Sequence, residues 1–350
     1  MSDIAIAGSG AIARAYAAML ARDGHRVSMW SPRDGARDLG NAVHATGLVE
    51  GRHGVAVSGS AQPIADADAV LVALPATAYA ATLPEIARRV RTSQTVFVSG
   101  ALSLAPLWLA ELAAANGTRP LIVASGTTVA TARSTDGGVS VNTIRTRVSI
   151  ASLPATRSAE ALAALTALFG ERFDVAPDVV AVTLANINPV AHAAMALANL
   201  TRIEYAEAWP QYRYLTPAVA RLVEAMDRER RGVAAAFGRD VLPIEAHFQR
   251  SFDVPQTALA DIAAELHRRR GGPAGPTSLD TRFVLEDVPY GLVVNAALGR
   301  IVNADTRVTD GAITLLSTLY GDDFRAGNPL IDALALGSAS RDSLLRRCAG

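Results

Sequence analysis

Two short segments in the second half of the chain carry side chains that can move a proton or hold an anion. In the first, Asn188 and His192 lie four residues apart, a spacing that places both on one face of a helix. Pro189 suits the first helical position, so we predict that Asn188 is the N-cap and that His192 lies one turn inside. The positive end of that helix favours a neutral imidazole and a bound substrate anion. A lone histidine is nevertheless more often a core residue than a catalytic one.

The second segment, residues 282–291, joins a cation to a carboxylate just before a predicted helix. Arg282 can clamp a substrate carboxylate, and Asp287 can orient and polarise a histidine. Each has an ordinary alternative, because Asp287 can cap a helix beginning at Val288 and Arg282 can form a surface ion pair. From the residues alone, both interpretations stay open.

A glycine-rich motif near the start of the chain predicts a dinucleotide site. It reads Gly8-Ser9-Gly10-Ala11-Ile12-Ala13. The motif follows a predicted strand and opens a predicted helix, which is the context that such a fingerprint requires. Gly8 permits the tight turn, Gly10 lets the backbone approach the pyrophosphate, and Ala13 keeps helix and strand close. The N–H groups at the helix start would bind the phosphates.

The second predicted strand ends without the carboxylate that would bind a ribose 2′-hydroxyl. Trp30 is followed by Ser31, Pro32 and Arg33, and the first acid is Asp34. A hydroxyl and a guanidinium suit a 2′-phosphate, because arginine pairs with phosphate in a bidentate fork. We therefore expect NADP(H) to be favoured over NAD(H). The alternative is that Arg33 is solvated or stacks on the adenine.

Residues after three other predicted strands lie at the same edge of a doubly wound sheet. Leu74 and Pro75 are expected to line the cofactor near its nicotinamide end. Thr128 is expected to offer a hydroxyl to the substrate, as are Ser99 and Ser125. Ordinary turn chemistry is the alternative for these hydroxyls.

The first half of the chain alternates short apolar runs with helical patterns, which predicts an α/β Rossmann domain with a parallel, doubly wound sheet. The predicted strands are Ile4–Ala7, Arg26–Trp30, Ala69–Leu74, Thr95–Ser99 and Leu121–Ala124. The predicted helices are Ala11–Arg22, Ala76–Val90 and Leu104–Asn116. A further β-like stretch, Val139–Leu153, precedes a helix at Ser158–Phe169. We place this NAD(P)-binding domain at residues 1–176.

From Pro177 onward, helical windows replace the β-like runs, which predicts a mostly α-helical substrate and catalytic domain at residues 177–350. The windows are Ala191–Tyr205, Pro217–Phe237, Pro255–Arg270, Val288–Ile301 and Asp310–Tyr320.

The composition favours a folded chain that acts on small molecules. Half of the 350 residues are hydrophobic, and 33 acidic residues balance 33 basic ones. A formal net charge of +0 gives no reason to expect nucleic acid or an anionic membrane as a partner. A homodimer is a further possibility, because the apolar helix predicted over Val288–Ile301 can face a core or a partner.

The residue types that are rare or absent in this chain limit the possible reaction mechanisms and the expected cellular compartment. All 33 basic residues are arginine, which excludes mechanisms that need a lysine. The single Cys348 excludes an intrachain disulfide and a multi-cysteine metal site, so we expect no metal and a cytoplasmic protein. Asp3 stands where a signal peptide would be basic, and the apolar stretch Ala69–Leu83 is interrupted by Pro75, so no membrane segment is expected.

Three motifs together resemble the opine dehydrogenase family, the relatives of octopine and nopaline dehydrogenases. They are the Rossmann start, the Asn-Pro-Val-x-His segment at Asn188–His192, and the Arg-x-x-x-x-Asp-Val-Pro-x-Gly segment at Arg282–Gly291. The resemblance extends from the first strand to the Asp310–Tyr320 helix. It implies the reductive condensation of an α-keto acid with the amino group of an amino acid or related amine, through an imine, with NAD(P)H as hydride donor.

By position, the resemblance implies a role for four residues. His192 and Asp287 match the proton-relay pair of the family, Arg282 matches the arginine that holds a substrate carboxylate, and Asn188 matches an asparagine one turn before the histidine. Residues 126–133 depart from the Glu-Thr and Leu-Pro-Tyr pattern of many relatives, which leaves small or unusual amines open as substrates.

Two other classes of function compete with this interpretation. One is an NADP(H)-dependent reductase of the ketopantoate or glycerol-3-phosphate type, but those families rely on a catalytic lysine. The other is a non-catalytic sensor of NADP(H), which would not need His192, Arg282 and Asp287 together.

Overall fold

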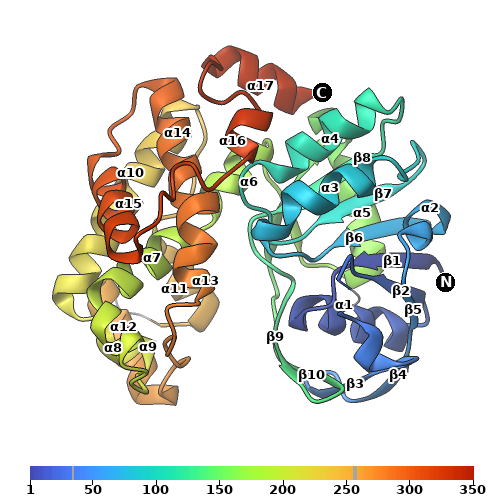
Figure 1. The fold of residues 1–350 in the computed structure, drawn as a ribbon, viewed down its shortest axis with the longest axis horizontal. Coiled ribbons are helices and arrows are strands. Elements are labelled where there is room, and N and C mark those ends of the chain that lie inside the picture. Colours follow the sequence, from blue (N-terminus) through green and yellow to red (C-terminus); the bar gives the residue numbers. More distant parts are fainter. Residues whose placement is uncertain (34, 255–257) are drawn as a thin grey trace. The chain divides into compact units, whose positions relative to one another are not determined.

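The computed structural model describes residues 1–33, 35–254 and 258–350, which form two compact units. Unit 1 comprises Met1–Thr183 and Leu344–Gly350, and unit 2 comprises Leu184–Ser343 (Figure 1). Unit 1 contains a largely parallel sheet with helices, and unit 2 is helical, so the predicted fold class is confirmed. Asp34 and the start of the helix predicted over Pro255–Arg270 lie outside the described residues.

The large sheet of unit 1 contains eight strands within the described residues, in the order β12-β11-β8-β7-β6-β1-β2-β5. All pairs are parallel except β11 with β8. Every residue of β6 and β8 is buried, as expected for strands covered on both faces. The strand bounds are β1 (Asp3–Ala7), β2 (Arg26–Trp30), β5 (Ala56–Ser58), β6 (Ala69–Val72), β7 (Thr95–Val98), β8 (Leu121–Ser125), β11 (Val148–Leu153) and β12 (Phe173–Val175).

A second, four-stranded sheet in the described part of unit 1 was not predicted. Its order is β4-β3-β10-β9, and its strands are β3 (Ala42–Gly47), β4 (Gly51–Gly54), β9 (Ala130–Thr135) and β10 (Gly138–Ile144). Strands β4 and β9 are largely polar and partly exposed, and β4 reads Gly-Arg-His-Gly, so they lack the apolar alternation on which strand prediction depends. The predicted run Val139–Leu153 is in fact two strands, β10 and β11, in different sheets.

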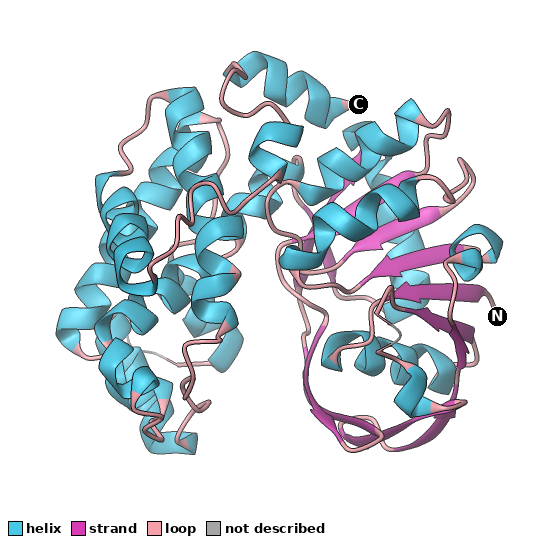
Figure 2. Cartoon of the chain, viewed as in Figure 1, coloured by secondary structure: helices cyan, strands magenta, loops and turns pink. Residues whose placement is uncertain are grey.

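Helix α1 (Ala11–Arg22) lies between the two sheets of unit 1 (Figure 2). Its residues 13–20 are all buried, because both sheets and the ring of Phe169 cover it. The other helices of unit 1 are α2 (Gln62–Asp66), α3 (Tyr79–Ala87), α4 (Ala105–Ala115) and α5 (Ser158–Phe169), with short 3-10 turns at Arg37–Leu39, Ala76–Ala78 and Ala155–Arg157. The helix predicted over Ala76–Val90 therefore begins as a 3-10 turn.

Unit 2 packs helices around a main apolar core built mainly from α7 (Asn188–Ala198), α10 (Pro217–Ala236), α14 (Val293–Val302) and α15 (Arg307–Tyr320). A smaller cluster contains Val254, Ile262 and Leu266. The predicted helix Val288–Ile301 begins as a π-helix, η4 (Val288–Leu292), and continues as α14 (Val293–Val302). Residues 293–299 are buried, so α14 faces this core. The remaining helices of unit 2 are α8 (Leu200–Glu204), α9 (Gln211–Tyr214), α11 (Ile244–Phe252), α12 (Leu259–Arg270), α13 (Arg282–Leu285) and α16 (Leu330–Ala333). Helix α6 (Val179–Ala185) spans the boundary between the units at residues 183 and 184.

One apolar helical window among the described residues, 179–198, is long enough to cross a membrane. Within the structure, 78% of this window is buried. A window of this kind is typical of a core helix.

The last seven residues of the chain belong to unit 1. All of them except Gly350 lie in α17 (Arg341–Ala349), where Arg347 bonds the carboxylate of Glu111 on α4 at 2.7 Å and Cys348 is fully buried. The domains predicted from sequence divide at residue 176 and assign these residues to the second domain. The pairing with Glu111 spans 236 residues, so no local pattern indicates it.

A buried ion pair on α10 forms hydrogen bonds with the backbone of α6, of α11 and of the segment between α10 and α11. The guanidinium of Arg230 donates to Asp227 at 2.7 Å, to the carbonyl of Leu242 at 2.7 Å and to the carbonyl of Leu184. The other oxygen of Asp227 accepts from the N–H of Ile244. Burial lowers the pKa of Arg230, and Asp227 opposes this shift, so the charge depends on its partner.

We predict that Asp227→Ala destabilises unit 2 strongly, by about 3–5 kcal/mol, because it leaves the Arg230 charge buried and unpaired. Calorimetric melting of the full chain measures this change. The matched control is Asp174→Ala, which breaks an exposed pair with Arg147 and should leave the melting temperature almost unchanged. Equal effects of the two substitutions would contradict the assignment.

Candidate active site

The two segments singled out in the second half of the sequence meet in unit 2. The Nδ1 atom of His192, on α7, lies 2.8 Å from Oδ2 of Asp287, which precedes η4. Asp287 is 1% exposed, whereas His192 is partly exposed. A buried carboxylate that accepts from Nδ1–H fixes the ring orientation and stabilises the protonated ring. Nε2 is then the nitrogen that can exchange a proton with a substrate.

A second contact holds the imidazole from its face. The ring of Phe283, on α13, stacks on His192 with centroids 3.8 Å apart and planes inclined by 5°. The stack covers one side of the ring, while Asp287 holds its edge. Sequence reasoning missed this role, because an aromatic residue next to Arg282 is equally typical of a core position.

The close approach of α7 and η4 depends on a glycine. A Cβ atom at Gly291 would lie 2.3 Å from Cγ of Pro189, so only glycine fits there. Asn328 donates to the carbonyl of Pro289 at 3.0 Å, which satisfies a backbone group in the π-helical turn. Turns of this kind often occur at functional sites. Gly291 and Pro189, both in the sequence motifs, therefore set the distance between His192 and Asp287.

The prediction that Asn188 is the N-cap of its helix is wrong by position. Asn188 is the first residue of α7. Ile187 occupies the N-cap position, and no side-chain hydrogen bond caps the helix there. Instead, Oδ1 of Asn186 accepts from the N–H of Asn188 at 3.0 Å, so the asparagine two residues earlier satisfies that donor. The capping alternative for Asp287 is also wrong, since its carboxylate makes no cap bond and binds His192.

Arg282 begins α13 at the edge of the site. Its Nε lies 3.3 Å from a carboxylate oxygen of the buried Glu286, yet its side chain is 60% exposed. Thr281 starts the turn by accepting from the N–H of Phe283 at 3.3 Å. An exposed pair of this kind adds little stability and leaves guanidinium donors for a substrate carboxylate.

Burial and the charge of Glu286 raise the pKa of Tyr290, which keeps that hydroxyl protonated.

The glycine motif of unit 1 has the geometry that a dinucleotide needs. Gly8 has φ +140, and a Cβ there would lie 2.3 Å from the carbonyl oxygen of Ala73. Gly10 precedes α1 in an extended conformation with no side-chain cap, and a Cβ there would meet nothing within 4 Å. The first turn of α1, which includes Ala11 and Ile12, therefore presents N–H groups to an open space beside the glycine backbone. These residues fit a bound pyrophosphate.

The segment after β2 is attached to the glycine motif by a residue that sequence reasoning missed. Arg14 of α1 is buried, donates from Nε to the carbonyl of Ser9 at 2.8 Å, and pairs with Asp38 at 2.9 Å. The hydroxyl of Ser31 is also 3.3 Å from that of Ser9. Arg33 is exposed. Arg14 thus binds the carboxylate of Asp38. Ser31 and Arg33, which were predicted to suit a 2′-phosphate, lie in the segment after β2.

The hydroxyl groups predicted to face a substrate in unit 1 bond within the protein. Thr128 donates to the carbonyl of Ala130 at 2.6 Å, and Ser125 donates to that of Thr127 at 2.8 Å. These are turn contacts, as the alternative interpretation expected. Leu74 is half-buried and Pro75 exposed just after β6, where they were predicted.

Ser99 takes part in a buried network that links α1 to two strand ends. Its hydroxyl lies 2.6 Å from that of Tyr16, which also accepts from the N–H of Val129 at 2.8 Å. Burial raises the pKa of Tyr16 to about 12, so the phenol stays neutral. Ser99 therefore has a structural partner, and Tyr16 fixes the edge of the sheet.

Within the described ranges, no group of three or more His, Cys, Asp or Glu side chains is arranged to hold a metal ion.

Comparisons with protein families divide the chain much as the fold does. Residues 175–320 match the family described as NAD/NADP octopine/nopaline dehydrogenase, alpha-helical domain. Residues 4–155 match the family described as ketopantoate reductase PanE/ApbA.

Two curated proteins resemble nearly the whole chain. An opine dehydrogenase of Arthrobacter sp. (strain 1C) is 29% identical over 345 residues, covering 95% of this chain and 94% of the relative. A vitopine synthase of Allorhizobium ampelinum is 24% identical over 363 residues, covering 97% of each.

Solved structures share the fold. An octopine dehydrogenase with NADH and L-arginine has a TM-score of 0.80 at 17% identity, covering 98% of this chain and 97% of that one. A yersinopine dehydrogenase with bound NADP+ has a TM-score of 0.71 at 16% identity, covering 99% and 97%. A ketopantoate reductase from Ralstonia eutropha is also similar, with a TM-score of 0.64 at 16% identity, covering 91% and 98%.

Proposed function

The chain belongs to the opine dehydrogenase family of NAD(P)-dependent oxidoreductases, and from this premise we propose that it joins an α-keto acid reductively to an amine. The keto carbonyl and the amino group would lose water to form an imine. The imine carbon would then take up a hydride and its nitrogen a proton, giving a secondary amine. Overall, the keto acid, the amine, NAD(P)H and one proton yield the secondary amine, NAD(P)+ and water. The bound nicotinamide supplies the hydride.

The observation that carries this proposal is the hydrogen bond between His192 and the buried Asp287. Water leaves the carbinolamine only after its oxygen is protonated, and Nε2 of a protonated His192 would supply that proton. Asp287 would stabilise the ring while it is charged, and Phe283 would keep water from one face. Arg282 would hold the keto acid by its carboxylate, and Asn188 would contact substrate beside the histidine.

We further propose that NADP(H) is the preferred cofactor. Ser31 and Arg33 are the groups that suit a 2′-phosphate, and Asp38 is bound by Arg14 instead of being free for a ribose hydroxyl. Gly8, Ser9, Gly10, Ala11 and Ile12 would cradle the pyrophosphate, and Leu74 and Pro75 would line the site. Related structures were determined with NADH and with NADP+, so both cofactors belong in the test.

The substrates proposed for the first test come from related structures. Octopine dehydrogenase was determined with L-arginine, with agmatine and with pyruvate, in each case with NADH. We propose that the substrates are a pyruvate-like keto acid and an amino acid or related amine. Thr128 is proposed as a contact of the substrate, and the cytoplasm as the compartment of the reaction. Residues 126–133 lack the usual family pattern, so small and unusual amines belong in the panel.

The direct test follows oxidation of NADPH and of NADH by the purified protein with keto acids and amines, together and singly. We expect oxidation only when both substrates are present, and faster with NADPH. Oxidation by the keto acid alone would favour the hydroxy-acid reductase suggested by the ketopantoate reductase match of residues 4–155. Tight NADP(H) binding without oxidation of any combination would favour a sensor.

We predict that His192→Ala and Asp287→Ala each reduce turnover at least about tenfold, because each removes part of the proton relay. Cofactor binding, measured by fluorescence titration, should stay normal, since the glycine motif is unchanged. His267→Ala is the matched control, because this partly buried histidine binds only the carbonyl of Gly271 among the contacts described. Unchanged turnover in either relay variant would exclude the assigned pair.

We predict that Arg282→Ala mainly raises KM for the keto acid, by roughly tenfold, because a charge-assisted bond to its carboxylate is lost. Arg300→Ala is the control, since its side chain is 59% exposed, close to the 60% of Arg282. Steady-state kinetics with each substrate varied in turn gives both constants. A change confined to KM for the amine would show that the role is misplaced.

A further inference from the structure

Helix α1 contains an arginine at a position where an apolar side chain would be expected. Residues 13–20 of this helix are all buried, and Arg14 is the one charged residue among them. A guanidinium that is removed from water is costly unless it is paired. Replacing a buried ion pair by apolar side chains is often neutral or even stabilising. Stability alone therefore does not account for an arginine at this position.

The contacts of Arg14 join the segment after β2 to the glycine motif. Its Nε donates to the carbonyl of Ser9 at 2.8 Å, and its Nη2 donates to the carbonyl of Gly35 at 3.3 Å. The same Nη2 bonds both carboxylate oxygens of Asp38, at 3.0 and 2.9 Å. A Cβ atom at Gly35 would lie 2.6 Å from Oγ of Ser9 and 3.8 Å from Oγ of Ser31, so the segment packs directly on the motif. Arg14 and Gly35 thus bring the carboxylate of Asp38 into the surroundings of the Ser31 hydroxyl.

The charge of Asp38 bears on which cofactor this segment accepts. Its side chain is 52% exposed, whereas that of Arg14 is 8% exposed. A carboxylate without a cationic partner repels a 2′-phosphate and can accept a hydrogen bond from a ribose 2′-hydroxyl. Paired with Arg14, the carboxylate is neutralised, and both of its oxygens already accept hydrogen bonds. Asp34, the other acid of residues 31–40, lies outside the described residues.

We propose that Arg14 determines the cofactor preference without contacting the cofactor, by neutralising Asp38 near the 2′-phosphate. This inference rests on the proposed binding of NADP(H) by unit 1, and it names the residue that permits that binding. Ser31 and Arg33 would contact the phosphate, whereas Arg14 is a positioning residue that removes an opposing charge. Without Arg14, Asp38 would disfavour NADPH and become available to the ribose of NADH.

The two kinds of contact that Arg14 makes affect the two cofactors differently. Its bond to Ser9 supports the glycine motif, and the pyrophosphate that this motif would bind is common to NADPH and NADH. Loss of that bond should therefore weaken both cofactors equally. Its bonds to Asp38 neutralise a charge that only the 2′-phosphate of NADPH opposes. The ratio of the two dissociation constants isolates this electrostatic contribution, because the common contribution cancels.

The test measures the dissociation constants of NADPH and NADH by fluorescence titration of the purified full chain. Arg14→Leu should weaken NADPH roughly tenfold more than NADH, because a carboxylate without its partner then faces a phosphate. Higher salt should reduce this difference, since Asp38 is half-exposed and its charge is screened. Water can hydrate the half-exposed carboxylate, so we expect the variant to fold, and its melting temperature checks this.

Variants of Asp38 separate the charge from the structural role. Asp38→Asn alone should leave the affinity for NADH within about twofold of the wild type, because a carboxylate bound by Arg14 is not a ribose ligand. This variant keeps Arg14 in place, so it tests the proposal even if Arg14→Leu does not fold. Combining Asp38→Asn with Arg14→Leu should restore the wild-type ratio of the two constants, although both cofactors bind more weakly.

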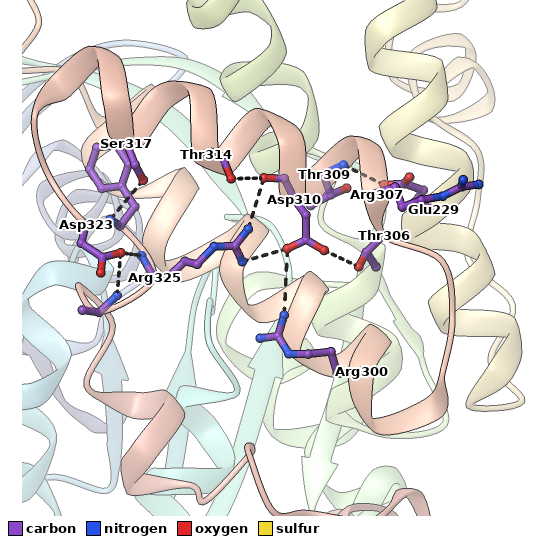
Figure 3. Close-up of polar contacts among 12 residues, drawn as sticks. Glu229, Arg300, Thr306, Arg307, Thr309, Asp310, Thr314, Ser317, Asp323 and Arg325 are labelled. Carbon is purple, nitrogen blue, oxygen red and sulfur yellow. Dashed lines mark hydrogen bonds and ion pairs between the residues drawn. The ribbon is translucent and has the colours of Figure 1, made fainter.

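Arg325→Leu is the matched control, because Arg325 makes the same kinds of contact in unit 2. Its Nη1 lies 2.8 Å from Oδ1 of Asp310, and its Nη2 donates to the carbonyl of Asp310 at 3.2 Å (Figure 3). The residues proposed to bind the cofactor lie in unit 1. Loss of Arg325 should therefore leave the ratio of the two constants unchanged, whatever its effect on the melting temperature.

Two results would overturn the proposal. One is an Arg14→Leu variant that binds both cofactors more weakly in equal measure, since Arg14 would then have a structural role alone. The other is a loss of NADH affinity in Asp38→Asn, which would make Asp38 a ribose ligand. A wild type that prefers NADH would contradict the proposed cofactor, while the change of the ratio in Arg14→Leu would still decide the role of Arg14. None of these titrations needs turnover, so failure of the proposed reaction would not affect them.

Discussion

The contact on which the rest of the account depends is the hydrogen bond between His192 and Asp287. It joins residues 95 positions apart and requires a carboxylate to be buried almost completely. Burying that charge without a partner would be costly, so the pairing and the local fold support each other. Much of unit 2 serves this contact: the core holds α7 against η4, Gly291 lets Pro189 approach, and Phe283 covers the ring.

Under the proposed function, unit 1 would hold the pyrophosphate of an anionic cofactor with backbone N–H groups, and Arg33 would add a charge beside the 2′-phosphate. The uncapped start of α1 beside Gly8 and Gly10 would provide the donors, and the buried Arg14 bonds both Ser9 of the motif and Asp38 of the segment after β2. The residues proposed for the cofactor and those proposed for proton transfer thus lie in separate compact units. This division agrees with the separate family matches of the two halves.

Long periodic segments were predictable from the sequence, as α1 and α5 were found at their predicted bounds. Strands β4 and β9 were missed because they are short, polar and half-exposed. The pairing of His192 with Asp287 followed from a family resemblance, since no local spacing connects them. The stack of Phe283 and the bonds of Arg14 depend on tertiary packing, which no single segment encodes.

The most direct test of the central claim traces the transferred hydrogen. NADPH carrying deuterium at its transferable position would be supplied with pyruvate and an amine, and the products analysed by mass spectrometry. We predict one deuterium on the carbon that joins the carboxylate to the new secondary nitrogen. Deuterium found instead in a 2-hydroxy acid, with the amine present and unchanged, would contradict it.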